Sequence, residues 1–158
     1  MKTAEIMFSL IGLALTGRSV DDAVLDSIDE NTLLSIYELS NKHDLSHIIA
    51  EALTTLGIKA EGEIMKKLER KQLVAIYRYE QIRYETESIR AALEAAEIPF
   101  ILLKGAKSRE YYPEPFMRTS CDIDVLVNEK DLKRATLVLE NNLLYTTNNK
   151  INFHDVSL

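Results

Sequence analysis

The sequence predicts an α+β chain in which an N-terminal helical bundle precedes a small mixed β-sheet. Apolar residues recur at helical spacing up to about residue 96, and residues 63–97 contain neither glycine nor proline. From Pro99 onward the pattern changes to short apolar runs that are typical of strands. We therefore expect a helical region over residues 1–96 and an α/β core over residues 97–158. The expected strands include 98–104, 121–127 and 143–147.

The first helix is expected in the apolar stretch from Ala4 to Thr16. A membrane-spanning helix needs about 20 apolar residues, so this stretch should be buried in protein and not in a membrane. Asn31 is expected to cap a second helix. A third helix should end at Gly57, and it carries a helical repeat of apolar residues: Leu45, Ile48, Ile49, Ala52, Leu53 and Leu56.

The glycine-free and proline-free stretch from residue 63 predicts one long helix, or two nearly continuous ones. At about 100° per residue a narrow apolar stripe runs along it, and we expect this stripe to face the core. The interleaved arginines could serve as a stacking platform for nucleic-acid bases, but neighbouring glutamates offset them, which favours a solvated, salt-paired flank. The stripe consists of Leu73, Tyr77, Tyr84, Ala91 and Ala95.

Charge and cysteine content narrow the function classes. The net charge is −6, and residues 1–96 hold 11 basic and 16 acidic side chains. An acidic helical half argues against nucleic acid as a partner, since binding its backbone needs clustered Lys and Arg. Cys121 is the one cysteine, so no internal disulfide can form, and we expect a reducing, cytoplasmic location. It should be a small residue of a buried strand, not a nucleophile.

Two carboxylates, Asp122 and Asp124, carry the chemistry. In a strand they point to one face, while Ile123, Val125 and Val127 point to the other face, into a core. Neighbouring carboxylates repel each other unless a cation lies between them. Mg²⁺ prefers oxygen ligands, and one or two carboxylates plus substrate phosphates are its usual set. The pattern predicts a site for Mg²⁺ or Mn²⁺.

A phosphate-binding turn is expected just upstream of these carboxylates. Gly105 follows the first strand and lets backbone N–H groups approach a phosphate. Lys104 could pair with phosphate or with the carboxylates, or simply end a strand. Arg118 has the fork-shaped charge that clamps phosphate oxygens, although a plain surface arginine would look the same. Together these residues predict a metal–triphosphate site.

Several motifs resemble those of the uncharacterised nucleotidyltransferases in the DNA polymerase β superfamily. They are Ile98–Ala106 with its Leu-Lys-Gly turn, Tyr111–Pro115, Arg118, Asp122–Val127 with its Asp-x-Asp, and Asp131-Leu132. The resemblance implies transfer of a nucleoside monophosphate from an NTP to an acceptor hydroxyl of unknown identity. It makes Asp122 and Asp124 the catalytic and metal-binding residues. It makes Lys104, Gly105, Ala106 and Arg118 nucleotide-binding, although Ala106 departs from the Gly-Ser pair that is common in the superfamily.

The resemblance also implies a third carboxylate on a later strand, and only Asp155 follows the third expected strand. We expect the strand with the third acid to fall beyond Leu158, so that the core is incomplete at its C-terminus. The chain should then bind Mg²⁺–NTP weakly and transfer nucleotide very slowly or not at all. An open sheet edge would favour homo-oligomers.

Two other function classes stay open. An Asp-x-Asp also occurs in glycosyltransferases that bind a nucleotide-sugar through a divalent ion, but those place a nucleotide-binding α/β unit before the motif. The second alternative is a non-catalytic nucleotide-binding, metal-binding or interaction module, which the absent third carboxylate favours.

Overall fold

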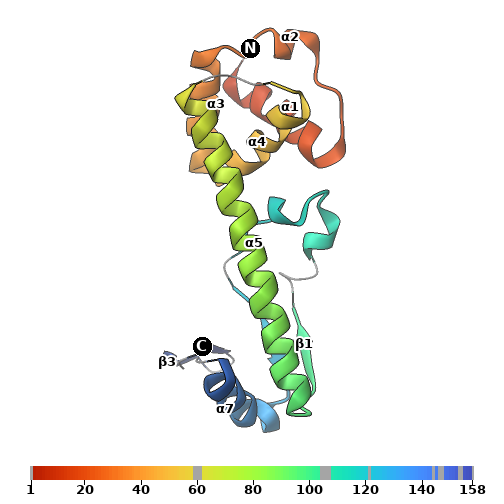
Figure 1. Cartoon of the computed structure of the whole chain (residues 1–158), viewed down its shortest axis with the longest axis vertical. Helices are drawn as coiled ribbons and strands as arrows, with labels where there is room; N and C mark the ends of the chain where they lie inside the picture. Colours follow the sequence, from red (N-terminus) through yellow and green to blue (C-terminus); the bar gives the residue numbers. More distant parts are fainter. Residues whose placement is uncertain are drawn as a thin grey trace. The chain divides into compact units, whose positions relative to one another are not determined.

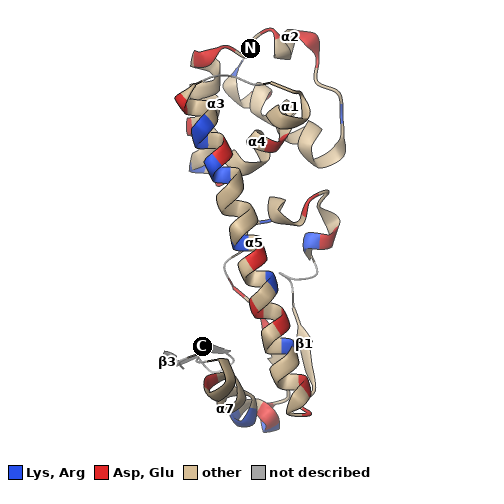
Figure 2. Ribbon diagram, in the orientation of Figure 1, with Lys and Arg blue, Asp and Glu red and all other residues tan. Residues whose placement is uncertain are grey.

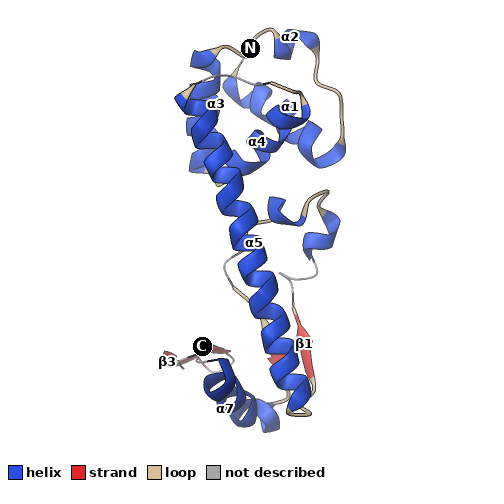
Figure 3. Cartoon of the chain, viewed as in Figure 1, coloured by secondary structure: helices blue, strands red, loops and turns tan. Residues whose placement is uncertain are grey.

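The structure of the chain is a computed structural model that describes residues 2–58, 62–103, 108–120, 122–143, 145, 148–152 and 155–157. Helices make up most of it, and the strands are short (Figure 3). The two sheets of the described residues are each two-stranded and antiparallel. The chain is therefore mainly α with minor β, and the prediction of a mixed sheet is wrong for the described residues.

Contacts divide the chain into two compact units, each formed from two segments. The first unit comprises residues 1–79 and 109–119, and the second comprises residues 80–108 and 120–158. The long helix α5 (Glu63–Ala95) contributes to both units. The expected domain division at residue 96 stays a prediction.

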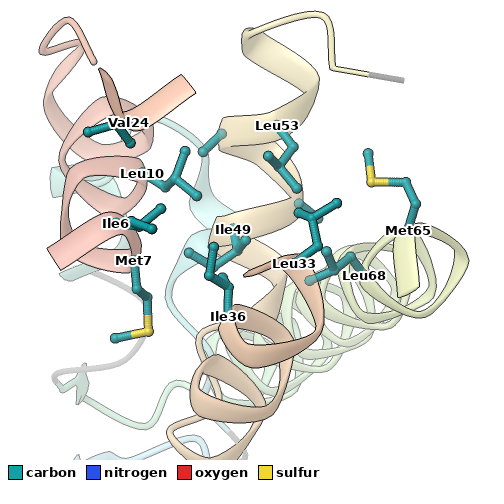
Figure 4. Packing of buried hydrophobic residues seen from close by; sticks show 12 residues of the cluster. Ile6, Met7, Leu10, Val24, Leu33, Ile36, Ile49, Leu53, Met65 and Leu68 are labelled. Atoms are coloured by element: carbon teal, nitrogen blue, oxygen red, sulfur yellow. The ribbon is translucent and has the colours of Figure 1, made fainter. Parts of the chain in front are cut away.

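The first unit is a helical bundle of α1 (Thr3–Thr16), α2 (Asp22–Leu25), α3 (Glu30–Lys42), α4 (Ser46–Thr55) and the first part of α5 (Figure 1). Its core is aliphatic, and the side chains point toward one another from all five helices (Figure 4). Among the described residues, no helix is long and apolar enough to cross a membrane. The most deeply buried side chains of this core are Leu10, Ile36, Ile49, Leu53 and Leu68.

Local signals set the ends of these helices. Gly17 ends α1 with a φ of 68°, a left-handed conformation that glycine adopts without strain. At the start of α3 the N-cap is Asp29, whose carboxylate accepts a 2.7 Å hydrogen bond from the Thr32 N–H. The prediction that Asn31 caps this helix is wrong, because Asp29 can already satisfy a free N–H of the first turn.

The segment 109–119 packs onto the helical bundle. It contains two 3₁₀ turns, η1 (Arg109–Tyr111) and η2 (Pro115–Met117). Phe116 and Met117 of this segment form a buried cluster with Ile48 of α4 and Ala75 of α5. The segment is thus part of the first unit, although in the sequence it lies between β1 (Phe100–Leu102) and β2 (Val125–Val127) of the second unit.

The apolar stripe predicted to be the buried face of α5 is in fact its exposed face. Leu73 is 66% exposed, and Tyr77 and Tyr84 are more exposed still. The buried side chains lie on the opposite side at about 100° per residue. The helix carries apolar residues on both sides, so its periodicity alone selects the wrong one. The buried apolar residues are Met65, Leu68 and Ala75 in the first unit and Ile89 and Leu93 in the second.

The second unit packs β1 (Phe100–Leu102), β2 (Val125–Val127) and α7 (Leu132–Leu143) against the C-terminal part of α5. Strands β1 and β2 pair antiparallel, with Ile101 opposite Leu126. Ile101 is 59% exposed and Leu126 is also exposed. One face of β1–β2 therefore packs on the core and the other is open.

The third strand lies later in the chain than predicted. Leu143 is the last residue of α7, and Tyr145 is in no strand; residues 144, 146 and 147 lie outside the described residues. Helix α7 follows the 3₁₀ turn η3 (Glu129–Asp131). The chain then forms a hairpin of β3 (Asn148–Asn152) and β4 (Asp155–Ser157).

Candidate functional site

Asp122 and Asp124 lie in extended chain that leads directly into β2. The backbone N–H of Leu103 donates a 2.9 Å hydrogen bond to the Asp124 carbonyl oxygen, which continues the β1–β2 pairing by one step. Ile123 and Val125 pack on the core of the second unit. Because side chains alternate along an extended chain, the two carboxylates belong to the face away from that core.

Both carboxylates are open to a ligand. Asp122 is exposed and Asp124 is half-buried. Neither carboxylate forms a hydrogen bond or an ion pair with another of the described residues. Two unpaired carboxylates at adjacent same-face positions fit a hard divalent cation that takes its remaining ligands from phosphate and water. In the described part of the chain no three His, Cys, Asp or Glu side chains come together, so no complete protein cage exists there.

The predicted phosphate-binding turn falls outside the described residues. Lys104, Gly105 and Ala106 follow Leu103 directly in the sequence, and Leu103 is hydrogen-bonded to Asp124. Cys121, the predicted buried strand residue, is likewise outside the described residues.

Arg118 belongs to the first unit, whereas Asp122 and Asp124 belong to the second. It follows η2 and is half-buried. Its Nε atom is buried and, among the described residues, has no hydrogen-bond partner. A buried guanidinium nitrogen without a partner costs free energy, so this nitrogen is a candidate for contact with an acceptor on a ligand. Its role toward nucleotide stays a prediction.

A second arginine lies near Arg118, and no sequence pattern indicated it. Arg109 is only 5% exposed, and its Nε donates to the Arg118 carbonyl oxygen at 3.4 Å. Its guanidinium lies 5.7 Å from the centre of the Tyr79 ring, a cation–π distance. Burial lowers the pKa of Arg109 below its ordinary value, and the nearby charge of Arg118 acts in the same direction. No local pattern marks Arg109, because its burial depends on α5, far away in the sequence.

A model of a family described as uncharacterised nucleotidyltransferases matches residues 29–155. The chain belongs to this family. The match begins at the N-cap of α3 and covers α3, α4, α5, β1, β2, α7 and β3. It also spans every candidate site residue, from Lys104 to Asp124. Neither the curated proteins nor the solved structures include a match to this nucleotidyltransferase family member.

Proposed function

We propose that the chain binds an NTP with Mg²⁺ or Mn²⁺ and transfers the nucleoside monophosphate to an acceptor hydroxyl. Membership of the nucleotidyltransferase family supports the reaction class. The hydrogen bond between Leu103 and Asp124 supports Asp122 and Asp124 as the site residues, since it brings the end of β1 beside the second carboxylate. In the sequence, Lys104, Gly105 and Ala106 follow Leu103 directly.

Asp122 and Asp124 would hold the cation through their carboxylate oxygens. Bound by these two residues, the ion would supply positive charge that stabilises the negative charge developing on the phosphate oxygens during transfer. The protein's own contribution would be positioning: backbone N–H groups at Gly105 and Ala106 bind phosphate oxygens, and Lys104 and Arg118 neutralise their charge. Positioning and electrostatics supply most of the rate enhancement in phosphoryl chemistry, so few side chains are needed.

A non-catalytic nucleotide-binding module is the second candidate. One observation favours it: in the part of the chain that the structure describes, no third acidic or metal-ligating side chain joins Asp122 and Asp124. Asp155 is the first residue of β4. Its replacement distinguishes nucleotide transfer from non-catalytic nucleotide binding. Binding without transfer, unchanged in Asp155→Ala, would identify the module, and transfer lost in Asp155→Ala would make Asp155 the third acid.

Calorimetric titration of the chain with a non-hydrolysable NTP tests the proposal, with and without Mg²⁺. We expect binding only with the metal, and a loss of about tenfold or more in Asp122→Asn and in Asp124→Asn, because each loses one charged ligand. Glu129→Gln is the matched control: it removes an exposed carboxylate of the same unit, in η3, and should bind as wild type.

A parallel titration with nucleotide-sugars separates the glycosyltransferase alternative. Preference for nucleotide-sugar over NTP would support that class, and metal-independent binding of either would contradict the role of Asp122 and Asp124. Turnover is then measured with a labelled NTP and a panel of hydroxyl-bearing acceptors.

A further inference from the structure

The first unit contains a small polar cavity that the proposed transfer site does not use. Its volume is about 50 Å³, and it lies between the turn that joins α3 to α4, the face of α5 and the end of the segment 109–119. A buried water needs roughly 10–15 Å³ of such volume, so the cavity holds about three to five water-sized atoms. The four oxygens of a phosphate group match this size.

Two cations on α5 line this cavity. Lys71 and Arg78 are seven residues apart, two turns of helix, so both lie on one side of α5. Within the described residues, neither makes a hydrogen bond or an ion pair with a protein group. Other cations of the same helix do pair, and acidic residues (red in Figure 2) lie before and after the stretch 71–78, which contains none. The paired ones are Lys66 with Glu63, Arg83 with Glu80, and Arg90 with Glu87.

The remaining polar groups of the cavity leave a net positive charge. Asp44 is the one acidic residue among those that line it, against two cations. Its Oδ2 already accepts a 3.1 Å hydrogen bond from the Thr119 hydroxyl. His47 is only 3% exposed. Its Nε2 lies 3.0 Å from the Met117 carbonyl oxygen, so this nitrogen donates a hydrogen bond to that oxygen. Lys71 and Arg78 are therefore left to attract an anion.

We propose that this cavity binds the phosphate group of a phosphate monoester through Lys71 and Arg78. The arginine fork can donate two parallel hydrogen bonds to phosphate oxygens, and the lysine adds a point charge. The site lies wholly in the first unit and requires neither Asp122 nor Asp124, so it is a second site, beyond the proposed transfer function. Thr119, which also lines it, precedes Asp122 by three residues in the sequence.

Titration of the full chain with inorganic phosphate in the presence of EDTA tests the site, since chelation removes any metal-dependent binding. Shifts in the NMR signals of the Ser46, His47 and Thr119 amides report occupancy. We expect Lys71→Gln and Arg78→Gln each to weaken phosphate binding about tenfold, because each removes a charged hydrogen-bond donor. Arg70→Gln is the matched control: Arg70 is an exposed neighbour of Lys71 and does not line the cavity.

Asp44→Asn gives a test in the opposite direction. Asp44 has a φ of 54°, and asparagine tolerates that left-handed conformation and still accepts from Thr119. The variant removes only the negative charge, so phosphate should bind several-fold more tightly. Weaker binding in Asp44→Asn, or wild-type binding in both cation variants, would overturn the proposal. If a cation variant fails to fold, the Asp44→Asn result decides.

Competition distinguishes the source of the phosphate group. AMP and glycerol 3-phosphate are added, with EDTA, to the phosphate-saturated chain, and the same amide signals are followed. Displacement by either monoester supports the site. Displacement by AMP indicates a nucleotide ligand, and displacement by glycerol 3-phosphate indicates a non-nucleotide ligand. Displacement by neither contradicts a monoester site.

Discussion

The Nε2 atom of His47 lies 3.0 Å from the carbonyl oxygen of Met117, a residue 70 positions later in the chain. Both groups are buried. This hydrogen bond connects α4 to the segment 109–119 inside the first unit, and it satisfies a carbonyl that water does not reach. The hydrogen bond therefore adds to the apolar packing of Phe116 and Met117 in holding the segment on the bundle.

His47→Ala should destabilise the chain by about 1–3 kcal/mol, because the Met117 carbonyl would be left buried without a donor. Chemical denaturation followed by circular dichroism measures the change. His43→Ala is the control, since His43 is exposed at the end of α3 and its replacement should cost less than about 0.5 kcal/mol. Equal effects in the two variants would contradict the role of the hydrogen bond.

Two leucines of α5 test which side of that helix is buried. Leu93 is 0% exposed, and Leu93→Ala should cost about 2–5 kcal/mol through lost burial and a residual cavity. Leu73 belongs to the exposed stripe, so Leu73→Ala should change the free energy of unfolding by less than about 0.5 kcal/mol. The reverse order would restore the sequence-based assignment of the buried face.

The cap at Asp29 predicts a pH-dependent stability. Hydrogen bonds from the backbone and side chain of Thr32 lower the pKa of Asp29 below its ordinary value of 3.8. The cap should therefore contribute fully above that value and be lost as pH falls through the lowered pKa of the folded state. We expect Asp29→Ala to lower the thermal midpoint at pH 7 and to have little effect near pH 2. Asn31→Ala, at the position predicted from sequence, should leave the midpoint unchanged at pH 7.

Removing Asp124's carboxylate should separate metal binding from folding. The hydrogen bond from Leu103 goes to the Asp124 backbone carbonyl, so Asp124→Ala should keep the β1–β2 pairing. The thermal midpoint should stay within error of wild type, while affinity for Mn²⁺, measured by calorimetry, falls below detection. A variant that unfolds would show that the side chain has a structural role instead.

Arg118→Lys tests the arginine fork. Lysine keeps the charge but cannot form the bidentate contact, so affinity for Mg²⁺–NTP should fall about tenfold. Affinity for Mg²⁺ alone should not change. Arg90→Lys, at a surface ion pair of α5, is the control and should bind NTP as wild type. Unchanged NTP affinity in Arg118→Lys would leave Arg118 without a part in nucleotide binding.

The sequence by itself determined the features that depend on neighbouring residues. A stretch without glycine or proline predicts one long helix or two nearly continuous ones, and the structure has one, α5. Gly57, predicted to end the third helix, follows α4 with a φ of 68°. Alternation at Ile123, Val125 and Val127 predicts the face that packs on the core, and with it the common face of Asp122 and Asp124. Helical and extended periods are properties of the local backbone, so they can be read from adjacent residues.

Only the tertiary structure decided which of two apolar faces is buried and which distant residues meet. Helix α5 carries apolar residues on both sides, and its partners selected Leu68 and Leu93 over Leu73. The cavity beside Lys71 exists because Thr119 lies against the turn at Asp44, 75 residues earlier in the chain. Burial depends on which elements contact each other. The hydrophobic periodicity of one element does not specify its packing partner.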